Sequence, residues 1–301
     1  MVRPSLRWLA AVLLVVVPLW ASATTAIIYQ PQRRDRDVAQ DQWPKLFAEV
    51  RQQGFDTLVV QWTQYGDAFA APDEHAWLLQ RVRDAHAAGL HIVLGLGSDP
   101  AFFTLQDQKK GQDMADYLRT LSRRNAEVAH RWAGDLGGAA IAGWYLPMEI
   151  DDVRWNDPKA RAQLRDYLVE EQRQLDGIVS RPIYVTSFFA GHMTPDRYAD
   201  LVEDVQRSGV RTWVQDGAGT QRLEQGARQL YMAAAGRCAQ SHAQGFVYEL
   251  FRQTGSDKAF TATALSPADA GEVLAQRAPC QGDSVFFELR YLPAAGGILQ
   301  R

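Results

Sequence analysis

Short apolar runs alternate with amphipathic stretches through most of the chain. The runs are rich in Val, Ile, Phe, Tyr and Trp, and most are apolar at nearly every position. Such runs are typical of parallel strands that are covered on both faces. We predict strands at Thr25–Gln30, Thr57–Trp62, His91–Leu96, Ala140–Leu146, Pro182–Ser187, Thr212–Gln215, Gly245–Leu250 and Ser284–Leu289.

The stretches between these runs have helical periodicity. In the first of them Leu46, Phe47 and Val50 fall on one face, and Gly54 follows as a helix-ending signal. We predict helices at Trp43–Gln53, His75–Ala88, Gln112–Ala133, Lys159–Ile178, Pro195–Ser208, Gln221–Ala243 and Pro267–Arg277.

Strict alternation of strands and helices predicts an α/β protein with a parallel sheet. An open, doubly wound sheet would carry a Gly-rich first turn for phosphate, but the first turn here is Gln30-Pro31-Gln32-Arg33-Arg34. Eight strand–helix cycles without that motif favour a single-domain (β/α)8 TIM barrel over residues 24–293. Residues 294–301 are expected to form a loose C-terminal tail.

The N-terminus has the features of a secretory signal peptide. Arg3 and Arg7 precede the apolar segment Leu9–Leu19, and Ala21-Ser22-Ala23 matches a cleavage site. We therefore predict that residues 1–23 are removed and that the mature protein is periplasmic or secreted, with no stable membrane anchor. The alternative is an uncleaved anchor, for which the apolar run is short.

Two cysteines, Cys238 and Cys280, remain in the mature chain. An even pair in an oxidising compartment usually forms a disulfide, and we expect this one at the N-terminal end of the barrel strands. Two cysteines alone make a poor zinc site, and the six histidines lack metal-ligand spacing. We therefore predict no metal and no cofactor.

The net charge is slightly acidic. It changes from −3 to −5 when Arg3 and Arg7 are removed, and the chain has no basic blocks. This balance argues against nucleic acid as the main partner.

In a (β/α)8 barrel the active site lies at the C-terminal ends of the strands. The predicted strand ends are rich in aromatic rings, which stack on sugar rings, and in amides, which bind hydroxyl groups. The alternative is that the large rings only pack the barrel. The predicted substrate-binding residues are Gln30, Gln61, Trp62, Tyr65, Trp144, Trp155, Gln215 and Tyr248.

Carboxylates end several of the predicted strands. Glu149 follows the fourth strand, Glu249 lies in the seventh, and Asp216 follows the sixth. Retaining glycoside hydrolysis needs two carboxyl groups about 5 Å apart, and inversion needs roughly 6.5–9.5 Å. We predict Glu149 as the acid/base and Glu249 as the nucleophile, with Asp216 as the alternative second carboxylate. The structural alternatives are a helix cap for Glu149, a salt bridge to Arg252 for Glu249, and a tight turn for Asp216.

Carboxylates after the fourth and seventh strands resemble those of the clan A glycoside hydrolases, although Met148 stands where those enzymes usually have Asn. A closer resemblance, over most of the mature chain, is to a hydrolase-like barrel family catalogued as domain of unknown function 4434. The segments Gly143–Asp152 and Trp213–Gly219 carry it. The resemblance implies a sugar-active barrel and adds Asp216 to the site beside Glu149.

These observations lead to an exported glycoside hydrolase, with a polysaccharide or oligosaccharide as its partner. One alternative is a non-catalytic glycan-binding accessory protein on a hydrolase-like barrel, for example in exopolysaccharide synthesis or export. Met148 before Glu149 favours that alternative. A third hypothesis is a hydrolase or lyase that uses other carboxylates.

Overall fold

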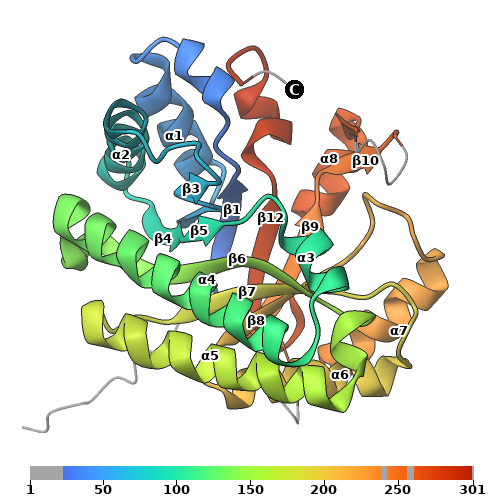
Figure 1. Cartoon of the computed structure of the whole chain (residues 1–301). Helices are drawn as coiled ribbons and strands as arrows, with labels where there is room; N and C mark the ends of the chain where they lie inside the picture. The colour runs from blue at the N-terminus through green and yellow to red at the C-terminus, as the bar shows by residue number, and fades with distance from the viewer. Residues whose placement is uncertain (1–22, 239–242, 256–260, 300–301) are drawn as a thin grey trace, which may run out of the picture.

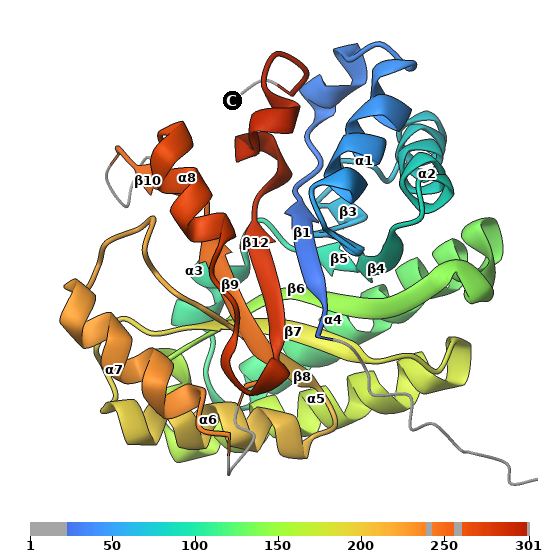
Figure 2. The same ribbon diagram turned by 180° about the vertical axis from the view of Figure 1, so that it is seen from behind.

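The computed structural model describes residues 23–238, 243–255 and 261–299, and it confirms the predicted barrel of eight parallel strands (Figures 1 and 2). The strands close in the order β1-β2-β4-β6-β7-β8-β9-β12. Their bounds are Thr25–Tyr29, Thr57–Val60, His91–Gly95, Ile141–Asp151, Ile183–Phe188, Arg211–Gln215, Gly245–Glu249 and Asp283–Phe287.

Helices surround the barrel (Figures 1 and 2). They are α1 Gln42–Gln52, α2 Pro72–Ala87, α3 Phe102–Gln108, α4 Gly111–Trp132, α5 Pro158–Ile178, α6 Pro195–Arg207, α7 Gln225–Ala235 and α8 Pro267–Leu274. The sequence did not predict α3. The prediction for α7 began too early, because Gln221 has a positive φ of 52° and cannot continue a helix. Part of that predicted helix, residues 239–242, lies outside the described residues.

Side chains form two apolar layers. The inner layer fills the barrel with alternate strand residues, among them Ile28, Val59, Val93 and Val247. At its centre the Trp213 ring stacks on Tyr184, with ring centroids 4.2 Å apart. The larger outer layer lies between strands and helices. Each strand therefore has a barrel-facing and a helix-facing side, and this alternation decides which residues reach the barrel mouth, meaning the C-terminal ends of the strands.

Strand β6 continues to Asp151, beyond the predicted end at Leu146. Its pairing with β7 shifts register between Leu146 and Glu149, around Pro147. Proline has no backbone N–H to donate, so it interrupts the ladder while the chain stays extended. Two small sheets also form in loops at the barrel mouth: β3 (Gln64–Tyr65) pairs with β5 (Gly97–Ser98), and β10 (Phe251–Gln253) pairs with β11 (Ala262–Ala264).

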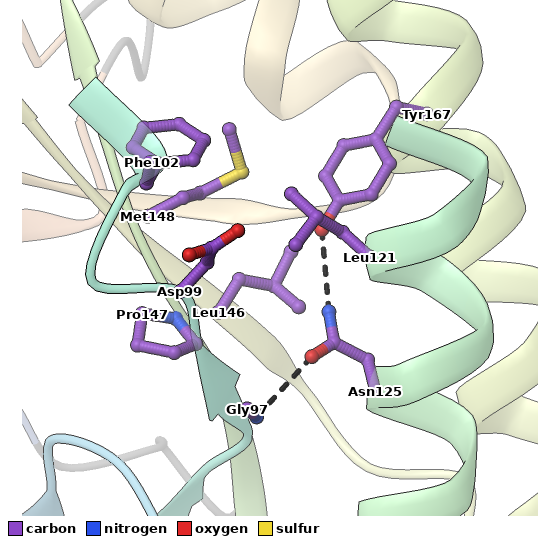
Figure 3. Close-up of a pocket in the computed structure, with 9 residues that line it drawn as sticks. All are labelled: Gly97, Asp99, Phe102, Leu121, Asn125, Leu146, Pro147, Met148 and Tyr167. Carbon is purple, nitrogen blue, oxygen red and sulfur yellow. Dashed lines mark hydrogen bonds between the residues drawn. The ribbon is translucent and has the colours of Figure 1, made fainter. Parts of the chain in front are cut away.

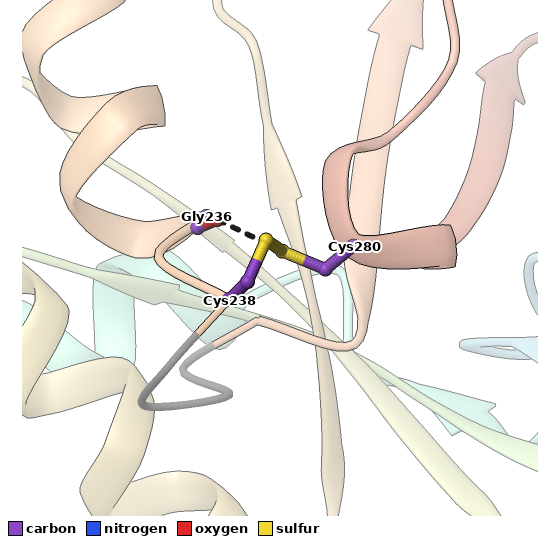
Figure 4. Close-up of a disulfide and its surroundings, with 3 residues drawn as sticks. All are labelled: Gly236, Cys238 and Cys280. Carbon is purple, nitrogen blue, oxygen red and sulfur yellow. Dashed lines mark hydrogen bonds between the residues drawn. A yellow bond between two sulfur atoms is a disulfide. The ribbon is translucent and has the colours of Figure 1, made fainter.

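The predicted disulfide between Cys238 and Cys280 is confirmed, with a Cα–Cα distance of 5.3 Å. Cys238 follows α7 and Cys280 precedes β12, so the bond lies at the N-terminal end of the strands (Figure 4). It is therefore remote from the barrel mouth.

The structure tests the prediction for the C-terminal end of the chain but not the prediction for the N-terminal end. The predicted signal segment lies outside the described residues, apart from Ala23. The expectation of a loose tail from residue 294 is wrong up to residue 299, because Ala295 and Leu299 are buried in the outer layer. Within the described ranges, no helix has the length and apolar character needed to cross a membrane.

A buried polar cluster joins α4 to α5. The Asn125 amide donates to Oε1 of Glu171 at 3.0 Å and to the Tyr167 hydroxyl at 3.2 Å. Glu171 is fully buried, and burial raises the pKa of its carboxyl group to about 7. The folded protein therefore holds this proton well above the pH at which an unfolded glutamic acid releases it.

This shift predicts a pH-dependent stability. Between pH 4.5 and about 7 the folded state binds more protons at Glu171 than the unfolded state does, so the free energy of unfolding falls as the pH rises. From pH 5 to pH 8 we expect a loss of about 2 kcal/mol that is absent from Glu171→Gln. Urea unfolding of both proteins across this range measures the difference.

Glu170→Gln is the matched control for that series. Arg173 lowers the pKa of the Glu170 carboxyl to about 2, which lies below the pH range tested. Its stability curve should run parallel to the wild-type curve. A Glu171→Gln curve that also runs parallel to the wild type would contradict the assignment.

Candidate active site

Alternate side chains of β8 and β9 face the barrel interior, and the last of these on each strand, Gln215 and Glu249, lie at the barrel mouth. Trp213 and Val247 belong to the inner layer, and Gln215 and Glu249 follow them by two residues on the same side. Glu149 lies beside Thr186 of the neighbouring β7, and its Oε1 accepts a hydrogen bond from the Gln215 amide at 2.8 Å. The ends of three strands thus direct these side chains into one place.

Glu149 is partly exposed, and its side chain accepts a hydrogen bond from the Gln215 amide. Burial of the carboxyl raises its pKa, and Asp151 adds to this effect. The Gln215 amide and the positive charge of Arg222 act in the opposite direction. The residue is therefore partly accessible, and its carboxyl retains its proton to a higher pH than an ordinary glutamic acid does.

Glu249 is almost completely buried, with 4% of its surface exposed. Its Oε2 accepts hydrogen bonds from the backbone N–H groups of Gly219 (2.6 Å) and Thr220 (3.3 Å). Burial raises the pKa of its carboxyl, and the nearby charges of Asp216 and Glu149 raise it further. The predicted alternative, an ion pair between Glu249 and Arg252, is not formed among the described residues.

Gly219 allows the loop after β8 to cover Glu249. A Cβ atom at this position would lie 2.7 Å from the Phe251 carbonyl oxygen and 2.9 Å from Oε2 of Glu249. Contacts this short do not occur in folded proteins, so the close approach of the loop requires glycine.

Asp216 begins that loop. It follows the inward-facing Gln215, so its side chain leaves the strand on the other side, and its Oδ1 accepts from the Ala218 N–H at 3.0 Å. Burial raises the pKa of its carboxyl. This geometry is that of the predicted structural alternative, a tight turn, and it places Asp216 beside Glu249 rather than opposite it.

The predicted amide and aromatic residues at the mouth fall into two groups. Gln30, Gln61, Trp62, Tyr65 and Gln215 are all at least partly exposed. The amide oxygen of Gln61 has no described hydrogen-bond partner. The Trp62 and Tyr65 rings lie face to face at a tilt, with centroids 4.6 Å apart.

Trp144, Trp155 and Tyr248 form the second group, and their prediction as substrate-binding residues is wrong. Both tryptophans are 0% exposed and Tyr248 is 4% exposed. Trp144 and Tyr248 occupy helix-facing positions of β6 and β9, and Trp155 lies in the loop after β6; all three pack into the outer layer.

Sequence reasoning missed other residues at the mouth. Phe287 packs against the inner layer and is partly exposed, and the Tyr145 hydroxyl lies 2.9 Å from Oγ1 of Thr186. Arg222 influences Glu149 from the loop before α7. Strict alternation along β12 would have identified Phe287, but nothing local marks Arg222.

Buried groups at the ends of β1 and β12 support Gln30. Glu288 accepts from the Gln30 backbone N–H at 3.1 Å, and Arg290 donates to the Gln30 carbonyl at 3.2 Å. Arg290 also binds both oxygens of Asp35, each at 3.0 Å. All three charged side chains are at most 2% exposed, so this cluster fixes one wall of the mouth.

Asp151 and Asp152 shape loops near Glu149. Asp152 accepts from the backbone N–H groups of residues 190–193 at 2.8–3.2 Å. Asp151 accepts from those of Val153 and Arg154. Asp151 thus fixes the loop after β6, and Asp152 fixes the loop after β7. Glu149 takes part in neither set of hydrogen bonds.

A small cavity of about 10 Å³ lies behind the irregular part of β6 (Figure 3). Leu146, Pro147 and Met148 form one wall, and Asn125 and Tyr167 face them. The volume is that of about one water molecule. None of the predicted catalytic side chains lines this cavity. No cluster of His, Cys, Asp and Glu within the described ranges has the makings of a metal site.

Three comparisons place the chain among known proteins. The family model described as Domain of unknown function (DUF4434) matches residues 25–289. The chain is 42% identical over 288 residues to the "Uncharacterized protein YbcH" of Escherichia coli (strain K12), covering 95% of this chain and 96% of that protein.

Solved structures share the fold. One is described as a "putative alpha-L-fucosidase" from Bacteroides thetaiotaomicron VPI-5482, with a TM-score of 0.60, 15% identity, and coverage of 95% of this chain and 91% of that chain. Another is the catalytic domain of a beta-amylase from Paenibacillus polymyxa, with a TM-score of 0.56, 8% identity, and coverage of 92% and 95%. At these identities the likeness shows a shared barrel fold.

Proposed function

Since the chain belongs to the family described as Domain of unknown function (DUF4434), and its barrel presents two carboxylic acids at the mouth, we propose that it is an exported glycoside hydrolase. Its substrate would be a polysaccharide or oligosaccharide. Glu149 and Glu249 would carry the reaction as a retaining pair.

The observation that carries this proposal is the position of Glu149 and Glu249 at the ends of two barrel strands, with Gln215 of β8, the strand beside β9, donating to Glu149. The two glutamates come from β6 and β9, which β7 and β8 separate in the barrel. Burial raises the pKa of the Glu249 carboxyl most, and the charges of Asp216 and, to a smaller extent, Glu149 add to the rise. Two carboxyl groups at one barrel mouth, with a raised pKa that keeps a proton available, are the arrangement used for acid catalysis at a sugar bond.

The surroundings of each carboxyl group support a different role for it. Glu149 is partly exposed and can exchange a proton with water, as an acid/base must. It would protonate the leaving oxygen and later remove a proton from the attacking water. Two backbone N–H groups bind Oε2 of Glu249 and hold it in a fixed orientation, which suits the nucleophile that attacks the anomeric carbon.

The remaining exposed residues suit sugar binding. The Trp62–Tyr65 pair offers an aromatic face for a sugar ring, and Gln30, Gln61 and Gln215 offer amides for its hydroxyl groups. Export is supported by the signal-like segment at residues 1–23 and by the disulfide, because such bonds persist in oxidising compartments.

The second candidate function is non-catalytic glycan binding on the same barrel. Met148 before Glu149 favours it, as does Asp216, whose carboxylate is occupied in a turn. A binding protein would use the same aromatic and amide residues without needing an ionisable pair.

The experiment is a reducing-end assay with a panel of bacterial glycans and three proteins: wild type, Glu149→Gln, and Glu272→Gln, which changes an exposed side chain on α8. We expect at least one glycan to be cleaved by wild type and by the control. The rate for Glu149→Gln should be lower by about 10²–10⁴-fold, the range for loss of an acid/base catalyst. Binding without cleavage, identical in all three proteins, would favour the accessory protein and contradict the hydrolase.

A further inference from the structure

A groove of about 450 Å³ lies on the outside of the barrel, between α4 and the loop that contains β3. Figures 1 and 2 show β3 and β5 between α2 and α4. The volume lies within the roughly 300–1,000 Å³ that is usual for small-molecule sites. Gln64 and Gly66 form one wall, and α4 forms the other.

Three arginines of α4 line the groove. They are Arg123, Arg124 and Arg131, and no carboxylate in the described part of the chain forms an ion pair with any of them. Other arginines of the surrounding helices, such as Arg119 and Arg173, are paired with a carboxylate on their own helix. The groove therefore concentrates guanidinium groups that form no ion pair within the described ranges.

Two of these guanidinium groups are held in place. Arg124 donates to the Gly66 carbonyl at 2.8 Å, and Arg131 donates to the Gln64 amide oxygen at 3.0 Å. Each keeps further N–H donors for a ligand, and Nε of Arg131 is buried without a hydrogen-bond partner. An anion in the groove would satisfy donors that the protein leaves open.

Asp67 and Glu127 also line the groove and reduce its positive charge. With three arginines against two carboxylates, the lining keeps one net positive charge. A ligand with separate anionic and hydroxyl groups fits this mixed lining better than a dense polyanion does. The fork of a guanidinium group matches a carboxylate or a sulfate, which accept two parallel hydrogen bonds.

We propose that this groove binds an acidic sugar unit, through its carboxylate or sulfate group. The inference rests on the proposed function in taking the ligand to be a glycan. The β3 loop supports the link, because Tyr65 lies between Gln64 and Gly66 in the sequence and its ring contacts the Trp62 ring at a tilt. The aromatic pair and one wall of the groove therefore belong to the same short segment of chain, residues 62–67.

Calorimetric titration of the full mature protein tests the proposal. The Glu149→Gln background prevents cleavage, and the probes are tetragalacturonate, a heparin-derived tetrasaccharide and neutral cellotetraose. We expect at least one acidic probe to bind tenfold or more tightly than cellotetraose. Comparison of the two acidic probes distinguishes carboxylate from sulfate.

Substitutions locate the binding. The double substitution Arg124→Gln/Arg131→Gln should lower the affinity for the acidic probe at least tenfold. Arg123→Gln should weaken it about threefold, and it is safe for folding because Arg123 is exposed and bonds only to the Thr120 hydroxyl among the described residues. The matched control is Arg173→Gln/Arg207→Gln, which removes two exposed charges from α5 and α6. It should change the affinity by less than twofold.

Equal affinity for acidic and neutral probes would overturn the proposal, as would equal losses in the groove and control variants. A single-stranded oligonucleotide of matched charge that binds as tightly as the sugars would also overturn it. The two proposals fail separately. If wild type cleaves a glycan and the groove variants bind the probes as tightly as before, only the proposal of a binding groove is refuted. If binding depends on the groove and no glycan is cleaved, only the proposal of a hydrolase is refuted.

Discussion

Glu249→Ala is expected to lower kcat on a cleaved glycan by about 10³-fold or more, because it removes the group that attacks the anomeric carbon. The Glu249 carboxyl is buried at the barrel mouth and is held by the N–H groups of Gly219 and Thr220. Azide can enter the space that the side chain leaves, attack the same carbon and give a glycosyl azide of inverted configuration. Azide added to Glu149→Ala should instead give the retained configuration.

Asp216→Asn is the matched control for this experiment. Asparagine keeps the oxygen that accepts from the Ala218 N–H, so the turn before α7 is preserved. We expect less than a tenfold loss of kcat. Product analysis by NMR with wild type should show retention at the anomeric carbon. A larger loss in Asp216→Asn than in Glu249→Ala would transfer the nucleophile to Asp216, and an inverted wild-type product would contradict the retaining mechanism.

Arg290→Met should lower the free energy of unfolding by about 4 kcal/mol at pH 7, since removal of one partner from a buried ion pair typically costs 3–5 kcal/mol. The variant leaves Asp35 and Glu288 buried at 1% and 2% exposure without their counter-ion. Urea unfolding measures the change. Part of the loss should return at pH 5, because burial already raises the pKa of the Glu288 carboxyl to about 7 and its protonation removes a buried charge.

Arg237→Met provides the comparison at the surface. Arg237 pairs with Asp196 where both side chains are half or more exposed, so we expect a change of at most about 0.5 kcal/mol. If Arg290→Met costs no more than Arg237→Met, the buried cluster does not stabilise the wall that holds Gln30.

The fold follows from local pattern because each barrel strand is apolar on both faces and each helix is amphipathic. Because the strands are apolar on both faces, the sequence does not predict which side chains point into the barrel and which point toward the helices. In Gly143–Leu146 the sequence does not say whether Tyr145 or Trp144 faces the barrel, and the structure places Tyr145 inside and Trp144 among the helices. The prediction for Trp144 was wrong because only the closed barrel determines which of two consecutive strand residues faces its interior.

The candidate site was predictable where a polar side chain ends an apolar strand, as Glu149, Gln215 and Glu249 do. Its supporting contacts were not predictable. Asp35 and Arg290 are separated by 255 residues, and barrel closure alone brings them together. The groove arginines were hidden for a similar reason, since their partners on the other wall come from a loop more than 50 residues earlier in the chain.

The Cys238–Cys280 bond has a consequence for how the protein is produced. It spans 42 positions, and the loop of chain that it closes contains β9 and therefore Glu249. Material made in a reducing cytosol would lack this covalent closure, and only non-covalent packing would then hold the strand that carries Glu249. Assays of activity should therefore use protein that has been secreted through an oxidising compartment, with the thiol count checked before any preparation is judged inactive.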